Sequence, residues 1–308
     1  MRGININKQY RNLVEKILKD GFEYEDPNRK GAIRKQIPFY RIEHDFKDGF
    51  PAIGLKQSYP KMAFNEMVLF MQGNTQIQDF WKLGVKFWDK DGYNYFLNRT
   101  QKDDYTFDEW KEFMNVFDSH TYGNLGRIYS HQIRKWNGNT DQLNNVLERL
   151  KKHPHSTKNI VTMWNPSDLD YCALSPCHRT FEFISDGNNL WVQWEQSSVD
   201  VGVGILMNIM YYSFVCEVFA HYLGLNAKGI IGNLSNVHLY DNSFDAMNEM
   251  LKRDETQIKE LPYLIKDLPT EWDNLDDFLS KLKYGESVKL KNYQHLGRID
   301  IEMLPYKK

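Results

Sequence analysis

One cysteine stands in a sequence context that could support nucleophilic chemistry. Cys177 lies between Pro176 and His178, and a thiolate there can add to an electron-poor carbon if its pKa is lowered or a base lies nearby. Tyr129 and Ser198 carry hydroxyls that could donate hydrogen bonds to the sulfur. Taken alone, Cys177 fits a small buried hydrophobic residue equally well, because most free cysteines behave that way.

An amide and a carboxylate follow the cysteine at the start of an apolar stretch. Asn208 lies inside the helix predicted over 201–223, and its amide can donate and accept at once, as the N–H and C=O edge of uracil requires. A buried amide without partners is costly, so a ligand or a fixed network is expected around it. Asp200 precedes the helix, where the helix dipole favours a carboxylate. Helix capping is therefore an alternative role for Asp200.

Three further polar residues have two possible readings each. His238 and Tyr240 alternate along a predicted strand, so they share a face and could hold a sugar hydroxyl or serve packing alone. Glu66 lies in an otherwise apolar helix. It is either a carboxyl with a raised pKa suited to proton transfer or, by periodicity, a surface residue.

Composition narrows the function classes. The 308 residues carry 39 basic and 41 acidic side chains, a net charge of -2, so no nucleic acid or membrane partner is expected. Three cysteines are too few for a disulfide framework and indicate a reducing compartment, the cytoplasm. Cys172 and Cys216 are assigned to packing.

Other kinds of site find little support in the chain. His153 and His155 are close in sequence, but no further ligand completes a metal site, so none is expected. No Gly-rich phosphate loop or dinucleotide fingerprint is present. The apolar run 201–219 is broken by polar residues and predicts a buried helix, not a membrane span. No signal peptide is visible.

The hydrophobic pattern predicts both helices and strands in one domain, 1–308. Segment 90–125 has no clear period and predicts a surface elaboration of loops and short helices. The fold class is therefore α+β, a mixed β-sheet flanked by helices. The expected helices are 10–18, 62–72, 141–151, 201–223 and 243–252, and the expected strands are 37–46, 159–164, 181–184, 190–193 and 237–240, with alternation at 286–290 and 299–303.

Taken together, these residues resemble the thymidylate synthase family and its pyrimidine nucleotide hydroxymethylase relatives, from about Arg29 to the C-terminus. The matching motifs follow the family's order. They are 48–56 (DGFP…K), 66–77 (ELLWFLxGxTNI), Trp88-Asp89, 125–129 (LGPVY), 141–143 (DQL), 164–165 with 174–178 (WN…LPPCH), 196–200 (QRSxD), Asn208, His238-Leu239-Tyr240 and 295–303.

The resemblance implies a mixed-sheet fold that dimerises through its sheet face, and an activity. That activity is transfer of a one-carbon unit from 5,10-methylenetetrahydrofolate to carbon 5 of a uracil nucleotide, dUMP to dTMP by default, through a Cys177 adduct. The implied catalytic residues are Cys177, Glu66, Tyr129 and Asp200. The implied substrate-binding residues are Arg29, His178, Gln196, Ser198, Asn208, His238, Tyr240 and Lys158, the last acting across the dimer. The implied folate-facing residues are Trp88, Asp200 and Leu174.

The chain departs from this family at the phosphate site. Arg29 matches a family arginine, but Ser197, Thr157 and Lys158 stand where the family has three more. A lysine lacks the guanidinium fork, and each lost charge-assisted bond is worth roughly 1.5–3 kcal/mol. Losing two weakens phosphate binding by about a hundredfold or more. Arg127, where the family has Pro, is a candidate replacement.

Two alternatives to methylation stay open. In hydroxymethylation of dUMP or a related pyrimidine, water and not hydride adds to the same intermediate. The retained Trp88 favours methylation. Asn208, where Asp is the other choice in the family, favours uracil over cytosine. The lost arginines also allow a non-catalytic homologue or one with an altered substrate.

Overall fold

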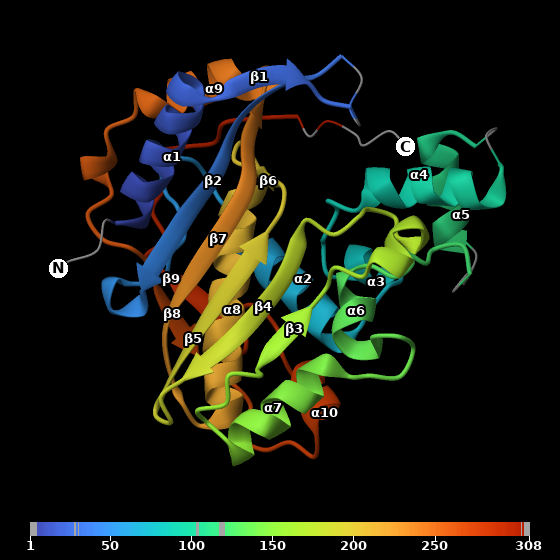
Figure 1. Ribbon diagram of the computed structural model, residues 1–308, viewed down its shortest axis with the longest axis vertical. Helices are drawn as coiled ribbons and strands as arrows, with labels where there is room; N and C mark the ends of the chain where they lie inside the picture. Colours follow the sequence, from blue (N-terminus) through green and yellow to red (C-terminus); the bar gives the residue numbers. More distant parts are fainter. Residues whose placement is uncertain are drawn as a thin grey trace.

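A computed structural model describes residues 5–27, 29, 31–102, 105–116, 121–302 and 304. Figure 1 shows one twisted sheet with its helices gathered behind it and at its sides. The sheet has seven strands in the order β1-β2-β7-β5-β4-β3, and β6 also pairs with β7. Its strands are β1 (Phe22–Glu25), β2 (Ile33–Asp45), β3 (Ile160–Thr162), β4 (His178–Ser185), β5 (Asn189–Gln196), β6 (Val199–Asp200) and β7 (Asn226–Tyr240).

Strand directions in this sheet are mixed. β5 and β6 run parallel to β7, whereas β2 pairs with β7 and β4 with β5 in antiparallel fashion. A separate two-stranded sheet joins β8 (Tyr263–Lys266) to β9 (Val288–Lys291). The predicted α+β class, with a mixed sheet flanked by helices, is confirmed.

The helices supply the second layer. They are α1 (Ile6–Asp20), α2 (Pro60–Gln72), α3 (Ile77–Lys82), α4 (Asp89–Thr100), α5 (Phe107–Val116), α6 (Tyr129–Lys135), α7 (Gln142–Lys152), α8 (Gly204–Leu223), α9 (Phe244–Leu251) and α10 (Leu275–Ser280). One hydrophobic cluster extends from Ile6 in α1 to Leu290 in β9, and we infer a single domain from it.

The long helix α8 is central because nearly all of its side chains are buried against the sheet and α2. In the part of the chain that the structure describes, no helix combines the length and the apolar character needed to cross a membrane. α8 begins at Gly204, later than predicted, because Asp200 accepts hydrogen bonds from the backbone of Gly202 and Val203 in a turn before it.

Strand β5 shows how the sheet separates its two faces. Leu190, Val192 and Trp194 are buried, whereas Trp191 and Gln193 are only partly covered. This period of two places the first set on the helix-covered face and the second on the opposite, open face.

Segment 90–125 contains short helices, as predicted, α4 and α5. Because their Phe96, Trp110 and Met114 are buried, the segment is packed into the core and is more than a surface elaboration. The alternation at 299–302 forms no strand, and the last residue of that prediction, Met303, lies outside the described residues. Short elements such as β1, α3 and α6 were not predicted.

A close approach between two strands gives a test of this packing. Gly232 in β7 lies opposite Trp194 in β5, and a Cβ on Gly232 would lie 2.4 Å from the indole ring. Because this ring is fully buried, we expect Gly232→Ala to lower the free energy of unfolding by about 1–3 kcal/mol. Urea unfolding measures the change.

The double variant with Trp194→Leu is the control, because the smaller side chain removes the clash. Adding Gly232→Ala to Trp194→Leu should then cost less unfolding free energy than adding Gly232→Ala to the wild type. Equal effects in both backgrounds would contradict this account of the packing.

Candidate active site

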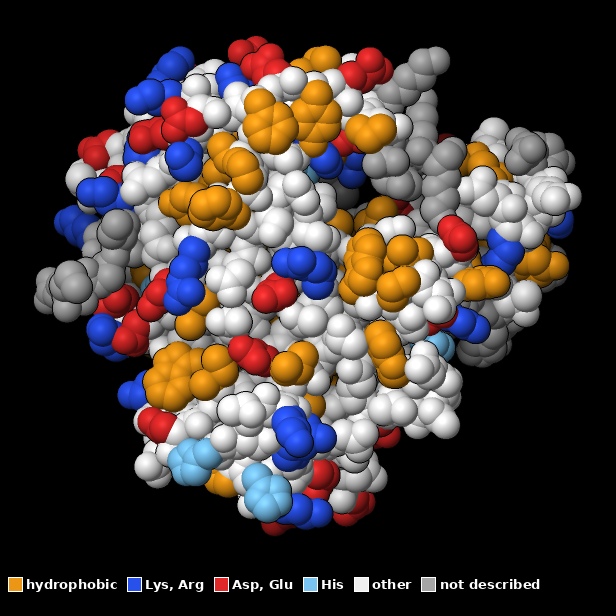
Figure 2. All heavy atoms as spheres, viewed as in Figure 1, with side chains coloured by type: hydrophobic (Ala, Val, Ile, Leu, Met, Phe, Trp, Pro, Cys, Tyr) orange, Lys and Arg blue, Asp and Glu red, His pale blue; other side chains and the backbone are white. Residues whose placement is uncertain are grey.

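One end of the sheet brings the predicted residues together. Because β4 and β2 run antiparallel to β5 and β7, the starts of the first two strands meet the ends of the last two. A cavity of about 390 Å³ lies at this end. Figure 2 shows a hollow there, beside the α4–α5 lobe, with basic side chains at its rim.

Nearly every predicted site residue lines this cavity. They are Arg29, Glu66, Trp88, Tyr129, Leu174, Cys177, His178, Gln196, Ser198, Asp200, Asn208, His238 and Tyr240.

Two predicted cations lie elsewhere. Lys158 is exposed between α7 and β3 and does not line the cavity of its own chain. Arg127 does not replace the missing positive charge, because it is ion-paired with Asp168 and lies over the Tyr171 ring. That prediction for Arg127 was wrong.

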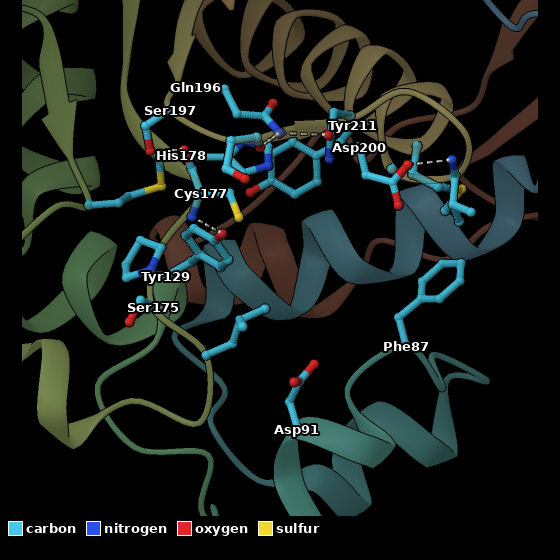
Figure 3. A pocket seen from close by; sticks show the side chains of 18 of the residues that line it. Phe87, Asp91, Tyr129, Ser175, Cys177, His178, Gln196, Ser197, Asp200 and Tyr211 are labelled. Atoms are coloured by element: carbon cyan, nitrogen blue, oxygen red, sulfur yellow. Dashed lines mark hydrogen bonds between the residues drawn. The ribbon is translucent and has the colours of Figure 1, made fainter. Parts of the chain in front are cut away.

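The Cys177 thiol lies just before β4, surrounded by hydroxyl groups (Figure 3). Its backbone N–H donates to the Tyr129 hydroxyl oxygen over 2.7 Å. Burial raises the pKa of the thiol, while hydrogen bonds from Tyr129 and Ser198 and the positive charge of Arg29 oppose that rise. The pKa stays above its usual value, so the neutral thiol is favoured, and Tyr129, Ser198 and Arg29 are the groups that would stabilise a thiolate when it forms.

Ser197 interacts with the backbone of Cys177. Its N–H and its Oγ both bind the Cys177 carbonyl oxygen, at 2.7 and 3.1 Å. The residue that replaces a family arginine thus fixes the loop that carries Cys177 and brings no positive charge to the cavity.

Glu66 faces the cavity from α2. Its Oε1 accepts a hydrogen bond from the indole of Trp88 over 2.9 Å. Burial raises the pKa of Glu66 to about 7, and the Trp88 bond only partly opposes this. Near neutral pH this carboxyl can therefore both give and take a proton.

A chain of amides fixes the orientation of Asn208. The indole N–H of Trp194 donates to Oε1 of Gln196 over 3.3 Å, so Nε2 of Gln196 faces the other way. That nitrogen donates to the Ser198 carbonyl oxygen (2.9 Å) and to Oδ1 of Asn208 (3.1 Å). An indole can only donate and a carbonyl can only accept, so the Nδ2 donor of Asn208 is left for the cavity.

Both histidines in the cavity are neutral. Burial lowers the pKa of His178 to about 3, and its Nδ1 pairs with the Tyr212 hydroxyl over 2.7 Å. Burial and the nearby charge of Arg34 lower the pKa of His238 to about 3. Nδ1 of His238 lies 2.7 Å from the Asn236 carbonyl. Since a carbonyl only accepts, Nδ1 of His238 carries the proton and Nε2 is an acceptor.

The two carboxylate oxygens of Asp200 differ in their hydrogen bonds. Oδ1 accepts from the backbone N–H groups of Gly202 and Val203 at 2.9 and 3.3 Å. Burial raises its pKa, against the charges of Arg29 and Lys56. Among the described residues, none donates a hydrogen bond to Oδ2, which can therefore accept an N–H from a ligand.

Part of the cavity wall is apolar. Phe87, Trp88, Leu174 and Met207 contribute to it, and Figure 3 shows Phe87 pointing into the cavity. Aromatic faces beside a free carboxylate oxygen suit a planar heterocycle that carries N–H donors.

Three charged residues of the cavity were not predicted: Asp26, Arg34 and Asp91. Arg34 could have been found, since period-two alternation in β2 places it on the same face as Gln36. Asp91 was missed because it lies in segment 90–125, which was predicted to be a surface elaboration.

Asp91 reaches the cavity from the first turn of α4, across from Cys177 (Figure 3). Burial raises its pKa to about 6, although the positive charges of Arg29 and Lys90 oppose the rise. Within the described residues, no group of three or more His, Cys, Asp or Glu side chains is arranged to hold a metal ion.

Comparison with known proteins shows the family of this chain. The sequence model of the thymidylate synthase family matches residues 8–305. The thymidylate synthase of Mesoplasma florum is 34% identical over 250 residues, 80% of this chain and 85% of the relative. That of Malacoplasma penetrans is 31% identical over 291 residues, covering 93% and 96%. That of Enterobacteria phage T4 is 30% identical over 293 residues, covering 93% and 94%. The chain belongs to the thymidylate synthase family.

The charge of Asp91 gives a pH-dependent prediction, because it raises the pKa of the Cys177 thiol. Removing it in Asp91→Asn should lower that pKa. Alkylation by iodoacetamide at pH 8 should be faster, with the midpoint of its pH profile at lower pH. The effect should fade below about pH 6, where Asp91 is itself protonated.

Asp108→Asn, which removes an exposed carboxylate from α5, is the matched control, and Cys177→Ser gives the background rate. An unchanged midpoint in Asp91→Asn would show that this carboxylate does not influence the thiol.

Proposed function

We propose that this protein transfers a one-carbon unit from 5,10-methylenetetrahydrofolate to carbon 5 of a uracil nucleotide, converting dUMP to dTMP. The observation that carries the proposal is the shared cavity of the Cys177 thiol and the Asn208 amide, with the donor nitrogen of Asn208 turned inwards. A thiol alone would not select a ligand, and an amide alone would not react with one. The free cysteines support a reducing location, the cytoplasm.

The chemistry begins at Cys177. Its thiolate forms a bond to carbon 6 of the uracil ring, and the electrons of the C5–C6 double bond move towards the oxygen on carbon 4. Asn208 Nδ2 donates to that oxygen and stabilises the developing negative charge. Carbon 5 becomes the nucleophile that forms a bond to the one-carbon unit. After carbon 5 loses its proton, the bond from that unit to the folate nitrogen breaks and leaves a methylene on carbon 5. For methylation, a hydride adds to this methylene, the C5–C6 double bond reforms and the sulfur leaves carbon 6, which regenerates the thiolate.

Proton movement falls to Glu66. With a pKa of about 7, its carboxyl can protonate or deprotonate groups at the base through a water. Tyr129 and Ser198 would hold the sulfur while it is charged, consistent with their effect on its pKa.

The folate supplies the one-carbon unit and, for methylation, the hydride. Trp88 and Leu174 would stack on its ring, and the free oxygen of Asp200 would accept its N–H groups. His238 Nε2 and the Tyr240 hydroxyl would hold the sugar hydroxyl. His178 would act as a neutral wall residue fixed by Tyr212.

Asn208 supports uracil over cytosine. A donor facing the cavity complements a ring carbonyl, whereas the amino group of cytosine at the same position would meet a second donor. Discrimination of this kind is worth about 1–3 kcal/mol, the cost of an unpaired buried polar group.

Hydroxymethylation is the second candidate, and Asp91 is the observation that favours it. A carboxyl with a pKa of about 6 on the side opposite Cys177 could take a proton from a water that adds to the one-carbon unit. The ring of Trp88, packed edge-on against Phe70 and Tyr129, favours methylation because it helps to exclude water from this side.

Incubation with dUMP and methylenetetrahydrofolate is the direct test. We expect dTMP and dihydrofolate in equal amounts, and no product from dCMP. A hydroxymethyl product with tetrahydrofolate would establish the second candidate instead. Failure to bind dUMP or dCMP in calorimetry would contradict both and support a non-catalytic homologue.

Two variants sharpen this assay. Cys177→Ser should abolish turnover and the release of tritium from carbon 5 of labelled dUMP, while dUMP binding persists. Tritium release that survives in Cys177→Ser would remove the thiol from the mechanism. Asn208→Asp should reduce turnover of dUMP at least tenfold and permit release of tritium from carbon 5 of dCMP.

The open face of the sheet supports a homodimer. Exposed or half-exposed apolar side chains lie on it, among them Phe39 (76% exposed), opposite Ser235, and Ile184 (40%), opposite Trp191. Figure 2 shows these apolar groups scattered over that face. A second copy stacked there would cover them, and Lys158 would then act in the partner's cavity.

Light scattering should give twice the mass of one chain, because stacking two open sheet faces would remove the apolar side chains on both faces from water. Phe39→Lys should shift the protein towards monomer, and Tyr59→Lys, which changes an exposed aromatic residue before α2, should not. A wild-type monomer at micromolar concentration would contradict the dimer.

A further inference from the structure

The positive charge in the cavity comes from two side chains of one chain. Among the described lining residues, only Arg29 and Arg34 are cationic, since both histidines are neutral. Any anionic group of a ligand that this chain binds by itself must therefore meet these guanidiniums.

Arg34 is held in place by its surroundings. Its Nε lies 3.0 Å from the carboxylate of Asp26, which is buried. Its two terminal nitrogens donate to the hydroxyl oxygens of Tyr24 and Tyr240 at 3.0 and 3.1 Å. Each terminal nitrogen carries a second N–H, so both can still donate to a ligand. The guanidinium is thus oriented in advance, which reduces the entropy lost on binding.

Arg29 and Arg34 both lie over the ring of Tyr240. The two guanidiniums lie 4.8 and 5.5 Å from the centre of the Tyr240 ring. Arg29 also donates to the Leu304 carbonyl. Asp26 is the only carboxylate within ion-pair distance of either guanidinium among the described residues. The pair therefore attracts an anion with more than one negative charge.

The position of Arg34 follows from the pairing of β2 with β7. Arg34 lies opposite Tyr240, and Gln36 lies opposite His238. Directly opposed residues in an antiparallel pair share a face. The guanidinium is thereby placed beside the two side chains that would hold the sugar, within the span of one nucleotide.

We propose that Arg34 is a substrate-binding residue that forms, with Arg29, a phosphate subsite built on Tyr240 within one chain. The subsite replaces the positive charge that Ser197 does not supply. This proposal rests on the proposed function in that the ligand is a pyrimidine nucleotide, and it assigns the recognition of its phosphate.

Binding of dUMP and of deoxyuridine, measured by calorimetry, separates phosphate recognition from sugar and base recognition. In Arg34→Gln we expect dUMP affinity to fall at least tenfold and deoxyuridine affinity to change less than about threefold. The salt dependence of dUMP binding should also weaken, because one cation is gone.

Lys35→Gln is the matched control. It removes a positive charge from the neighbouring position of β2, where Lys35 is ion-paired with Glu23 and does not line the cavity. Both ligands should bind this variant as they bind the wild type.

Arg34→Lys is a second, more conservative variant, in case Arg34→Gln does not fold correctly. Thermal melting tests the folding of both variants. Lysine keeps the charge but cannot contact Tyr24, Tyr240 and a phosphate together, so we expect a smaller, severalfold loss for dUMP alone.

Equal weakening of dUMP and deoxyuridine in the Arg34 variants would overturn the proposal and make Arg34 a positioning residue for Tyr240. Unchanged dUMP affinity would overturn it as well. A wild-type protein that binds neither compound would instead contradict the proposed function, so the two failures are distinguishable.

Discussion

A polar group can be buried only if its hydrogen-bonding needs are met, and the cavity depends on this constraint. Asn208 enters an apolar helix, α8, and would destabilise it without partners. Gln196 provides one, and it is fixed in turn by the donor-only indole of Trp194 and the acceptor-only carbonyl of Ser198. The same bonds that make the amide tolerable in the core determine which of its atoms a ligand meets.

Burial also determines the electrostatics of the site. It raises the pKa values of Cys177, Glu66 and Asp91, and it keeps His178 neutral. Charge on the sulfur is therefore costly until hydroxyl groups and a guanidinium stabilise it. The reactivity of the thiol therefore depends on the groups around it. The carboxyl of Glu66, with a pKa of about 7, lines the same cavity.

The positive charge of the cavity is arranged differently from the family pattern. Ser197 binds the backbone of Cys177, which keeps the loop that carries this thiol in place without a guanidinium. Arg34 enters instead from β2, anchored by Asp26. Since a buried arginine needs a compensating carboxylate, the two residues form one unit, and neither is useful to the site without the other.

The sequence by itself determined the family, the α+β class and most of the cavity, because its motifs preserve residue types that one chemistry requires. Period-two and helical patterns located β2, β5 and α2, and the long apolar run located α8. The sequence could not determine which way Asn208 points, that Arg127 is neutralised by Asp168, or that Asp91 faces the cavity of Cys177. Those facts depend on strand register and on contacts between residues far apart in the chain, and such contacts exist only once the sheet, α4 and α8 have packed together.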